Sequence, residues 1–130
     1  MSLSMAINAN SVVVLVVEDD IFVRYDIAAC LRDAGYVVVE AASGEEAIAL
    51  CKSTITIDIV FTDINLDGPS DGWDVGKRFG AERPNVPVLY TSGQCIGARS
   101  CGPRSLFVAK PYRQADILAA CQRLCGTSTF

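Results

Sequence analysis

One stretch of the chain, Ile57–Asn65, restricts the fold more than any other. It reads I-D-I-V-F-T-D-I-N and is rich in β-branched residues up to a carboxylate at Asp63. A strand that is apolar on both faces is buried on both faces, which is typical of the middle of a parallel sheet. The next residues, 66–72, are rich in turn-forming Gly, Pro, Asp and Ser. Asp63 is therefore predicted at the carboxyl edge of a sheet, where open α/β sheets bind ligands.

Four more apolar runs alternate with helical patterns. Strands are predicted at Val12–Val17, Tyr36–Ala41, Ile57–Thr62, Val86–Thr91 and Leu106–Ala109. Helices are predicted from Asp20 to Ala34, behind Ser43, from about Asp71 to Glu82 and over Tyr112–Cys125. This alternation predicts an α/β fold with a doubly wound, five-stranded parallel sheet and right-handed crossovers. Between the last two predicted strands, the segment Gly93–Arg104 contains three glycines and a proline, so the fourth helix is expected to be short or irregular.

Local signals mark the ends of these helices. Asp20 can cap the first helix and Gly35 can stop it, while Ser43 and Glu46 have the spacing of a capping box. Apolar residues at helical spacing predict the buried faces. These residues are Ile27, Cys30, Leu31 and Ala34 in the first helix, Ala47, Leu50 and Cys51 in the second, and Ile117, Cys121 and Leu124 in the last.

Length and charge limit the class of protein. The 130 residues suit one domain, expected over 12–125, with a flexible segment at 1–11 and a tail at 126–130. No apolar run approaches the ~20 residues of a membrane helix, and the start lacks the basic region of a secretion signal. The net charge of −4 argues against a nucleic-acid surface. We therefore expect a cytoplasmic protein that binds neither membrane nor nucleic acid.

The chain contains no histidine, which excludes a Ser-His-Asp triad, a Cys-His pair and the usual zinc sites. None of its cysteines forms a C-x-x-C motif, so most are expected to be reduced and buried. Cys95 and Cys101 are the exceptions, because their segment is expected to be exposed. The six are Cys30, Cys51, Cys95, Cys101, Cys121 and Cys125.

Polar side chains gather at one edge if the strand order is 2-1-3-4-5, because strands one and three are then neighbours about 4.8 Å apart. Glu18 and Asp19 end the first strand and would crowd Asp63. Crowded carboxylates raise one another's pKa values or bind a cation, and Mg²⁺ suits such a site. Thr91-Ser92 and Lys110 follow strands four and five. The edge therefore combines acids, hydroxyls and an ammonium group.

This combination suits phosphoryl transfer. An aspartate is ionised at neutral pH and can attack phosphorus without a general base, forming an aspartyl phosphate. A metal ion would neutralise charge on the transferred group, while a lysine and a hydroxyl would bind its remaining oxygens. The bland alternative, that Asp63 is only a solvated loop acid, is disfavoured by the joint pattern.

Four short motifs in this order resemble the response-regulator receiver domain of two-component and phosphorelay systems, which has a flavodoxin-like fold. They are Glu18-Asp19-Asp20, Asp63, Thr91-Ser92-Gly93 and Lys110-Pro111, and the resemblance covers about Val12 to Leu124. The resemblance implies roles for seven residues: Asp63 as phosphoacceptor, Asp19 as direct Mg²⁺ ligand, Glu18 as a ligand through water, the Asn65 backbone carbonyl as a further ligand, Lys110 as phosphate ligand, and Ser92 and Phe107 as switch residues. It also implies a cis peptide before Pro111. Phe107 can equally be a simple core residue.

The resemblance further implies a partner. Phosphate would come from the phosphohistidine of a histidine kinase or a histidine phosphotransfer protein, and the lack of histidine places that donor on another chain or domain. The domain would catalyse its own phosphorylation and dephosphorylation without being a conventional enzyme. The resemblance does not identify the downstream protein. It also leaves open whether the domain forms a weak homodimer and whether it is part of a larger kinase or regulator.

Other readings compete with this one. A degenerate receiver would bind partners without phosphorylation, although the intact acids, hydroxyl and lysine disfavour it. A dehalogenase-like phosphatase needs an acid where Asn65 stands, and a flavodoxin-like flavin site would be repelled by Glu18-Asp19-Asp20. A P-loop motif is absent. Two departures from the family pattern remain: the connection from Ser92 to Lys110 is short, and the loop before Gly72 carries an extra residue, similar to receivers attached to hybrid kinases.

Overall fold

The computed structural model describes residues 11–94 and 104–126 of the chain. Within them lie the five strands β1 (Val13–Val17), β2 (Val37–Ala41), β3 (Ile59–Asp63), β4 (Val88–Ser92) and β5 (Ser105–Ala109). The same residues form the four helices α2 (Ile21–Asp33), α3 (Gly44–Lys52), α4 (Gly72–Glu82) and α5 (Gln114–Gly126). Strands and helices therefore alternate as predicted. The predicted irregular helix falls mostly on residues 95–103, which lie outside the described part.

All five strands are parallel and lie in the order β2-β1-β3-β4-β5, which confirms the predicted sheet. Every residue of β3 and β4 is buried, as expected for strands covered on both faces. β3 ends at Asp63, which lies opposite Thr91 of β4. Because all strands run the same way, their carboxyl ends meet at one edge.

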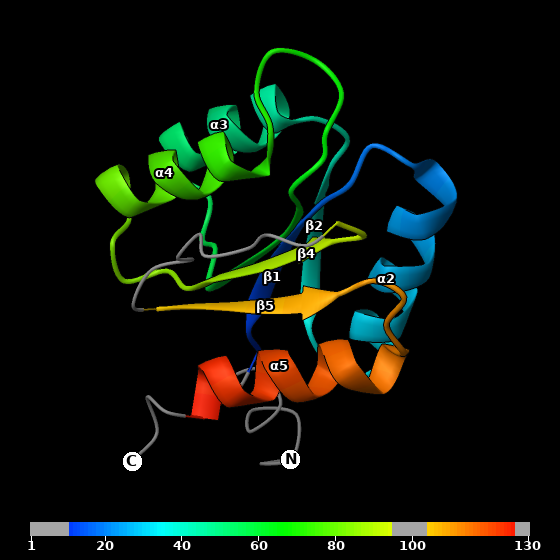
Figure 1. Cartoon of the computed structure of the whole chain (residues 1–130). Helices are drawn as coiled ribbons and strands as arrows, with labels where there is room; N and C mark the ends of the chain where they lie inside the picture. Colours follow the sequence, from blue (N-terminus) through cyan, green and yellow to red (C-terminus); the bar gives the residue numbers. More distant parts are fainter. Residues whose placement is uncertain (1–10, 95–103, 127–130) are drawn as a thin grey trace.

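Helices cover both faces of the sheet: α3 and α4 lie on one side, and α2 and α5 on the other (Figure 1). Side chains alternate between the two faces along each strand, which divides the buried residues into two clusters. The cluster under α3 and α4 includes Leu15, Val60, Val75 and Phe79. The cluster under α2 and α5 includes Val16, Phe61, Leu31 and Ile117.

The predicted helix ends are largely confirmed. The Asp20 carboxylate accepts hydrogen bonds from the backbone N–H groups of Phe22 and Val23, and Gly35 has a φ of 100° just beyond α2. Ser43 Oγ accepts from the N–H of Glu46, whose carboxylate in turn accepts from Ala42 rather than from Ser43.

Several predicted helix positions and element boundaries differ from the structure, among them Leu124, which is half-buried, the start of β4 at Val88 rather than Val86, and the start of α5 at Gln114 rather than Tyr112. Ala34 is exposed, because α2 ends at Asp33 and Ala34 is already its cap. Leu50 is only half-buried, although it packs against the core. β3 starts at Ile59 rather than Ile57. The Ile57 side chain is still buried, which explains why its apolar pattern resembled a strand.

Three of the described cysteines, Cys30, Cys51 and Cys121, are buried free thiols. Burial raises the pKa of Cys121 to about 12, so this thiol stays protonated at neutral pH. Cys95 and Cys101 lie outside the described residues. None of the helices in the described ranges 11–94 and 104–126 is long and apolar enough to cross a membrane.

Candidate functional site

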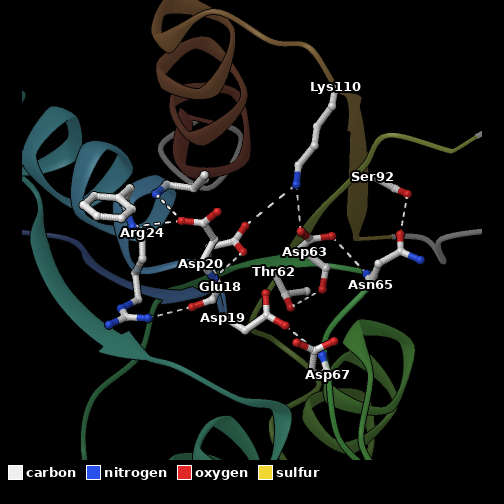
Figure 2. A network of polar contacts seen from close by, with 12 residues as sticks. Glu18, Asp19, Asp20, Arg24, Thr62, Asp63, Asn65, Asp67, Ser92 and Lys110 are labelled. Atoms are coloured by element: carbon white, nitrogen blue, oxygen red, sulfur yellow. Dashed lines mark hydrogen bonds and ion pairs between the residues drawn. The ribbon is translucent and has the colours of Figure 1, made fainter.

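Acidic, hydroxyl and amino groups from four strands meet at the carboxyl edge of the sheet (Figure 2). Glu18 and Asp19 follow β1, Asp63 ends β3 and Ser92 ends β4. Lys110 follows β5, and its side chain extends from that strand towards the acids. The sequence predicted this edge for each of them, and the parallel sheet places them there.

Asp63 lies at the centre of the site. Its side chain is only 7% exposed, with Oδ2 2.7 Å from the ammonium group of Lys110. Its Oδ1 accepts a hydrogen bond of 2.9 Å from the backbone N–H of Asn65. Burial lowers the pKa of Lys110, but its hydrogen bond to Asp63 and the nearby acidic charges outweigh burial and raise it. This lysine therefore stays charged beside Asp63.

Glu18 is buried beside Asp63, with only 2% of its surface exposed. Its Oε2 accepts from the N–H of Asp20 at 2.9 Å, whereas Oε1 lies 3.8 Å from Lys110 Nζ. That is too far for a hydrogen bond, and Oε1 has no other partner. Burial, reinforced by the charge of Asp63, raises the pKa of Glu18 to about 7. The site thus holds a half-satisfied carboxyl group.

Asp19 points towards the loop after β3. Its Oδ2 accepts a 2.8 Å hydrogen bond from the backbone N–H of Asp67, 48 residues away. Burial pushes the pKa of Asp19 upwards, but the hydrogen bond from the Asp67 backbone and the influence of the neighbouring Glu18 carboxyl group outweigh it and lower that pKa. Asp19 is therefore held as a carboxylate beside the loop that follows β3.

Ser92 contacts Asn65 instead of Asp63. Its hydroxyl donates a 2.7 Å hydrogen bond to Asn65 Oδ1 and accepts one from the N–H of Gln94. The neighbouring hydroxyl of Thr91 is buried without a hydrogen-bond partner. Thr91 is in register with Asp63 across β3 and β4. The structure therefore brings Ser92 to the edge of the site but not onto the Asp63 carboxylate.

Phe107 lies away from the charged groups. It is in register with Tyr90 on β4, is half-buried and packs against the core under α3 and α4. The Tyr90 ring also packs against Trp73 in a tilted arrangement, with ring centroids 4.8 Å apart. Phe107 therefore contributes to the packing of the core in this structure. Its role as a switch residue stays a prediction.

Three contributions to this edge were not predicted from the sequence. Arg24 donates to the backbone carbonyl of Glu18, and the N–H of Asp67 holds Asp19. The Tyr112 ring packs edge-on against Phe61 behind the site. A basic residue one turn into the helix that follows an acidic run was the available signal for Arg24. Nothing local to Asp67 or Tyr112 indicated their contacts.

The donor set fits a hard divalent cation. Carboxylate oxygens are the ligands that Mg²⁺ prefers, and it binds through one or two of them while keeping several waters. The unpartnered, buried oxygen of Glu18 offers an acceptor for one of these waters beside Asp63. In the described part of the chain, no three Asp, Glu, Cys or His side chains form a ready-made cage. The residues therefore suit a partly hydrated ion rather than a fully enclosed one.

The family model for the response regulator receiver domain matches residues 14–122. The chain belongs to this family. The order β2-β1-β3-β4-β5 and the Lys110-Pro111 cis peptide agree with what the sequence resemblance implied. The receiver motifs are thus carried by a receiver fold.

Solved receivers resemble this one closely. A response regulator receiver protein from Sinorhizobium medicae WSM419 is 34% identical, with a TM-score of 0.84 over 89% of this chain and 95% of that chain. The receiver domain of the sensor histidine kinase PA1611 from Pseudomonas aeruginosa PAO1 is 25% identical, with a TM-score of 0.77 over 89% of this chain and 98% of that chain. That structure has a magnesium ion coordinated in its active-site cleft.

The receiver also matches a longer regulator. It is 31% identical over 112 residues to the transcriptional regulatory protein PdtaR of Mycobacterium tuberculosis, which covers 82% of this chain. The chain spans about half the length of that relative, 53%. The likeness to PdtaR therefore concerns only about half of that protein.

Proposed function

We propose that this receiver accepts a phosphoryl group on Asp63 from a phosphohistidine of another chain or domain. The observation that carries the proposal is the buried Asp63 carboxylate, held 2.7 Å from the Lys110 ammonium group. Burying a carboxylate beside a lysine and a second acid is energetically unfavourable, because each charged group loses its hydration. A purely structural role would therefore not favour this arrangement. Membership of the receiver family supports the same role.

In this reaction an oxygen of Asp63 attacks phosphorus, so that an oxygen–phosphorus bond forms as the phosphorus–nitrogen bond to the donor imidazole breaks. The electron pair of the broken bond returns to the imidazole nitrogen. Lys110 then binds an oxygen of the transferred group, since its charge is fixed beside Asp63. The N–H of Asn65 holds the carboxylate in place before attack.

Mg²⁺ is the proposed cofactor, and when bound it would neutralise negative charge on the phosphoryl group. Asp19, Asp63 and the Asn65 backbone carbonyl would hold it, with Glu18 acting through water. The buried, unpartnered oxygen of Glu18 supports this assignment. The magnesium-bound receiver of PA1611 supports it independently.

The donor is proposed to be a histidine kinase or a histidine phosphotransfer protein, because this chain has no histidine of its own. After transfer, the Ser92 hydroxyl would leave Asn65 to bind a phosphoryl oxygen, and Phe107 would respond by repacking. The domain would thus catalyse its own modification without being a conventional enzyme. A degenerate receiver that docks partners without phosphorylation is the alternative.

Intact mass spectrometry tests the proposal. The protein is incubated with acetyl phosphate or phosphoramidate and Mg²⁺, with a parallel sample in EDTA. We expect the wild type and the Asp67→Asn control to gain one phosphoryl group, and Asp63→Asn to gain none. Phosphorylation of Asp63→Asn would contradict the assignment of the phosphoacceptor. No gain in the wild type under any condition would favour the degenerate receiver.

A further inference from the structure

Arg24, on helix α2, forms hydrogen bonds to a backbone carbonyl and to an acidic side chain of the neighbouring sheet. Its Nη1 donates a 2.8 Å hydrogen bond to the backbone carbonyl of Glu18, and its Nε lies 3.1 Å from Glu40 Oε1. The arginine side chain is only 15% exposed. One guanidinium group therefore joins α2 to the ends of both β1 and β2.

The carbonyl that Arg24 binds belongs to the first residue beyond β1. The N–H of Glu18 still continues the sheet by donating to the Ala41 carbonyl at 3.1 Å, whereas its carbonyl has left the strand ladder. The Glu18 side chain then accepts from the N–H of Asp20. The peptide between Glu18 and Asp19 is thus held from several directions. Its rotation would move both carboxyl groups of the site.

Glu40 fixes the guanidinium in turn. Its Oε1 pairs with Arg24, while its Oε2 pairs with Arg32 Nη2 at 3.3 Å. The planar guanidinium can bind two partners at once in a fixed geometry, which a lysine cannot do. Contacts of this kind behind a metal site typically change metal affinity 10–100-fold when removed.

Arg24 lies on the side of Glu18 away from Asp63 (Figure 2). Its hydrogen bonds go to a backbone carbonyl and to Glu40, not to the carboxylates of Glu18 or Asp63. Lys110 approaches those carboxylates directly from the opposite side. Arg24 can therefore hold the acidic residues in position, but it does not neutralise their charges directly.

We infer that Arg24, aligned by Glu40, is a positioning residue that holds Glu18 and Asp19 in the geometry needed to bind Mg²⁺. The inference rests on the proposed function, because it uses the metal site proposed there. It predicts that the loss of Arg24 weakens Mg²⁺ binding even where the protein stays fully folded.

The test is a titration of the full chain with MgCl₂, followed by the fluorescence of Trp73. Trp73 is a suitable reporter because it follows Gly72, which lies so close to the Asp63 backbone that a Cβ added to it would overlap the Asp63 carbonyl. Binding of Mn²⁺, measured by electron paramagnetic resonance, gives a second readout. Circular dichroism at each titration temperature verifies that every variant is folded.

We expect the Mg²⁺ dissociation constant to rise about 10-fold in Arg24→Met and by less in Glu40→Gln, as for other contacts behind metal ligands. Arg24→Lys should recover part of the affinity, because one ammonium donor can still reach the carbonyl. Arg32→Met is the matched control: it removes the other partner of Glu40 but leaves the Arg24 bond to Glu18. It should bind Mg²⁺ like the wild type.

Wild-type affinity in Arg24→Met, or an equal loss in Arg32→Met, would overturn the inference. Neither result would affect the assignment of Asp63 as the phosphoacceptor, which intact mass spectrometry tests separately. A wild-type protein that binds neither Mg²⁺ nor Mn²⁺ would overturn both the positioning role and the proposed metal site.

Discussion

Glu18 shows how a single buried acid links stability to the site. It is enclosed at the end of β1, and one of its oxygens lacks a hydrogen bond. Burial raises its pKa from 4.5 to about 7. Between these two pH values the folded protein keeps a proton that the unfolded chain has lost. Stability contributed by Glu18 is therefore present at low pH and falls as pH rises through this window.

The variant Glu18→Gln should remove this pH dependence. Relative to the wild type, it should gain on the order of 1–3 kcal/mol of unfolding free energy between pH 5 and pH 8 in metal-free buffer. Urea denaturation at the two pH values in EDTA measures the difference. Glu45→Gln, at an exposed position, is the control for the loss of one charge. Equal pH slopes in Glu18→Gln and wild type would argue against the raised pKa.

Two of the three glycines of the helix α4, Gly76 and Gly80, lie in opposite surroundings. A Cβ on Gly76 would overlap the Tyr90 hydroxyl, whereas a Cβ on Gly80 would meet nothing within 4 Å. Gly76 therefore allows Tyr90 to fit between the sheet and α4, where it packs against Trp73. The end of the same helix is tied to α3, because Arg83 donates to the carbonyls of Cys51 and Ser53.

Replacing each glycine by alanine should have opposite effects. Gly76→Ala should destabilise the protein by about 1–3 kcal/mol, because the Tyr90 ring must move. Gly80→Ala should stabilise it by roughly 0.5–1 kcal/mol, because alanine is the better helix former. Chemical denaturation measures both, and Trp73 fluorescence should change in Gly76→Ala alone. Stabilisation by both substitutions would show that Tyr90 relaxes without cost.

The whole domain has two separate buried clusters, one on each face of the sheet. Ile57 lies in the cluster under α3 and α4, with 4% of its surface exposed. Ile117, on α5, lies fully buried in the other cluster. The sheet backbone separates the two, so that neither side chain belongs to the packing of the other.

Substitutions in the two clusters should therefore be additive. Ile57→Val and Ile117→Val should each lower the unfolding free energy by about 0.5–1.5 kcal/mol, as is usual for loss of one buried methyl group. The double variant should lose the sum to within about 0.5 kcal/mol. Urea unfolding of the four proteins closes the cycle. A larger coupling would mean that the two faces repack together through the sheet.

Local patterns in the sequence were sufficient to predict the order of strands and helices and the residues at the ends of the strands. Apolar periodicity located β1 and β3, and the acids that follow them were visible as Glu18-Asp19 and Asp63. Caps such as Asp20 were equally readable. These features depend on neighbours within a few residues, so a local pattern is sufficient to predict them.

The partners of these residues, in contrast, became known only from the folded structure. Ser92 pairs with Asn65, the N–H of Asp67 binds Asp19, and Arg24 supports Glu18 from behind. The first two contacts join segments 27 and 48 residues apart in the chain. Such contacts depend on strand register, loop path and side-chain rotamers together. A hydrogen bond forms only when donor and acceptor lie within about 3 Å in a suitable direction, and no local pattern specifies that.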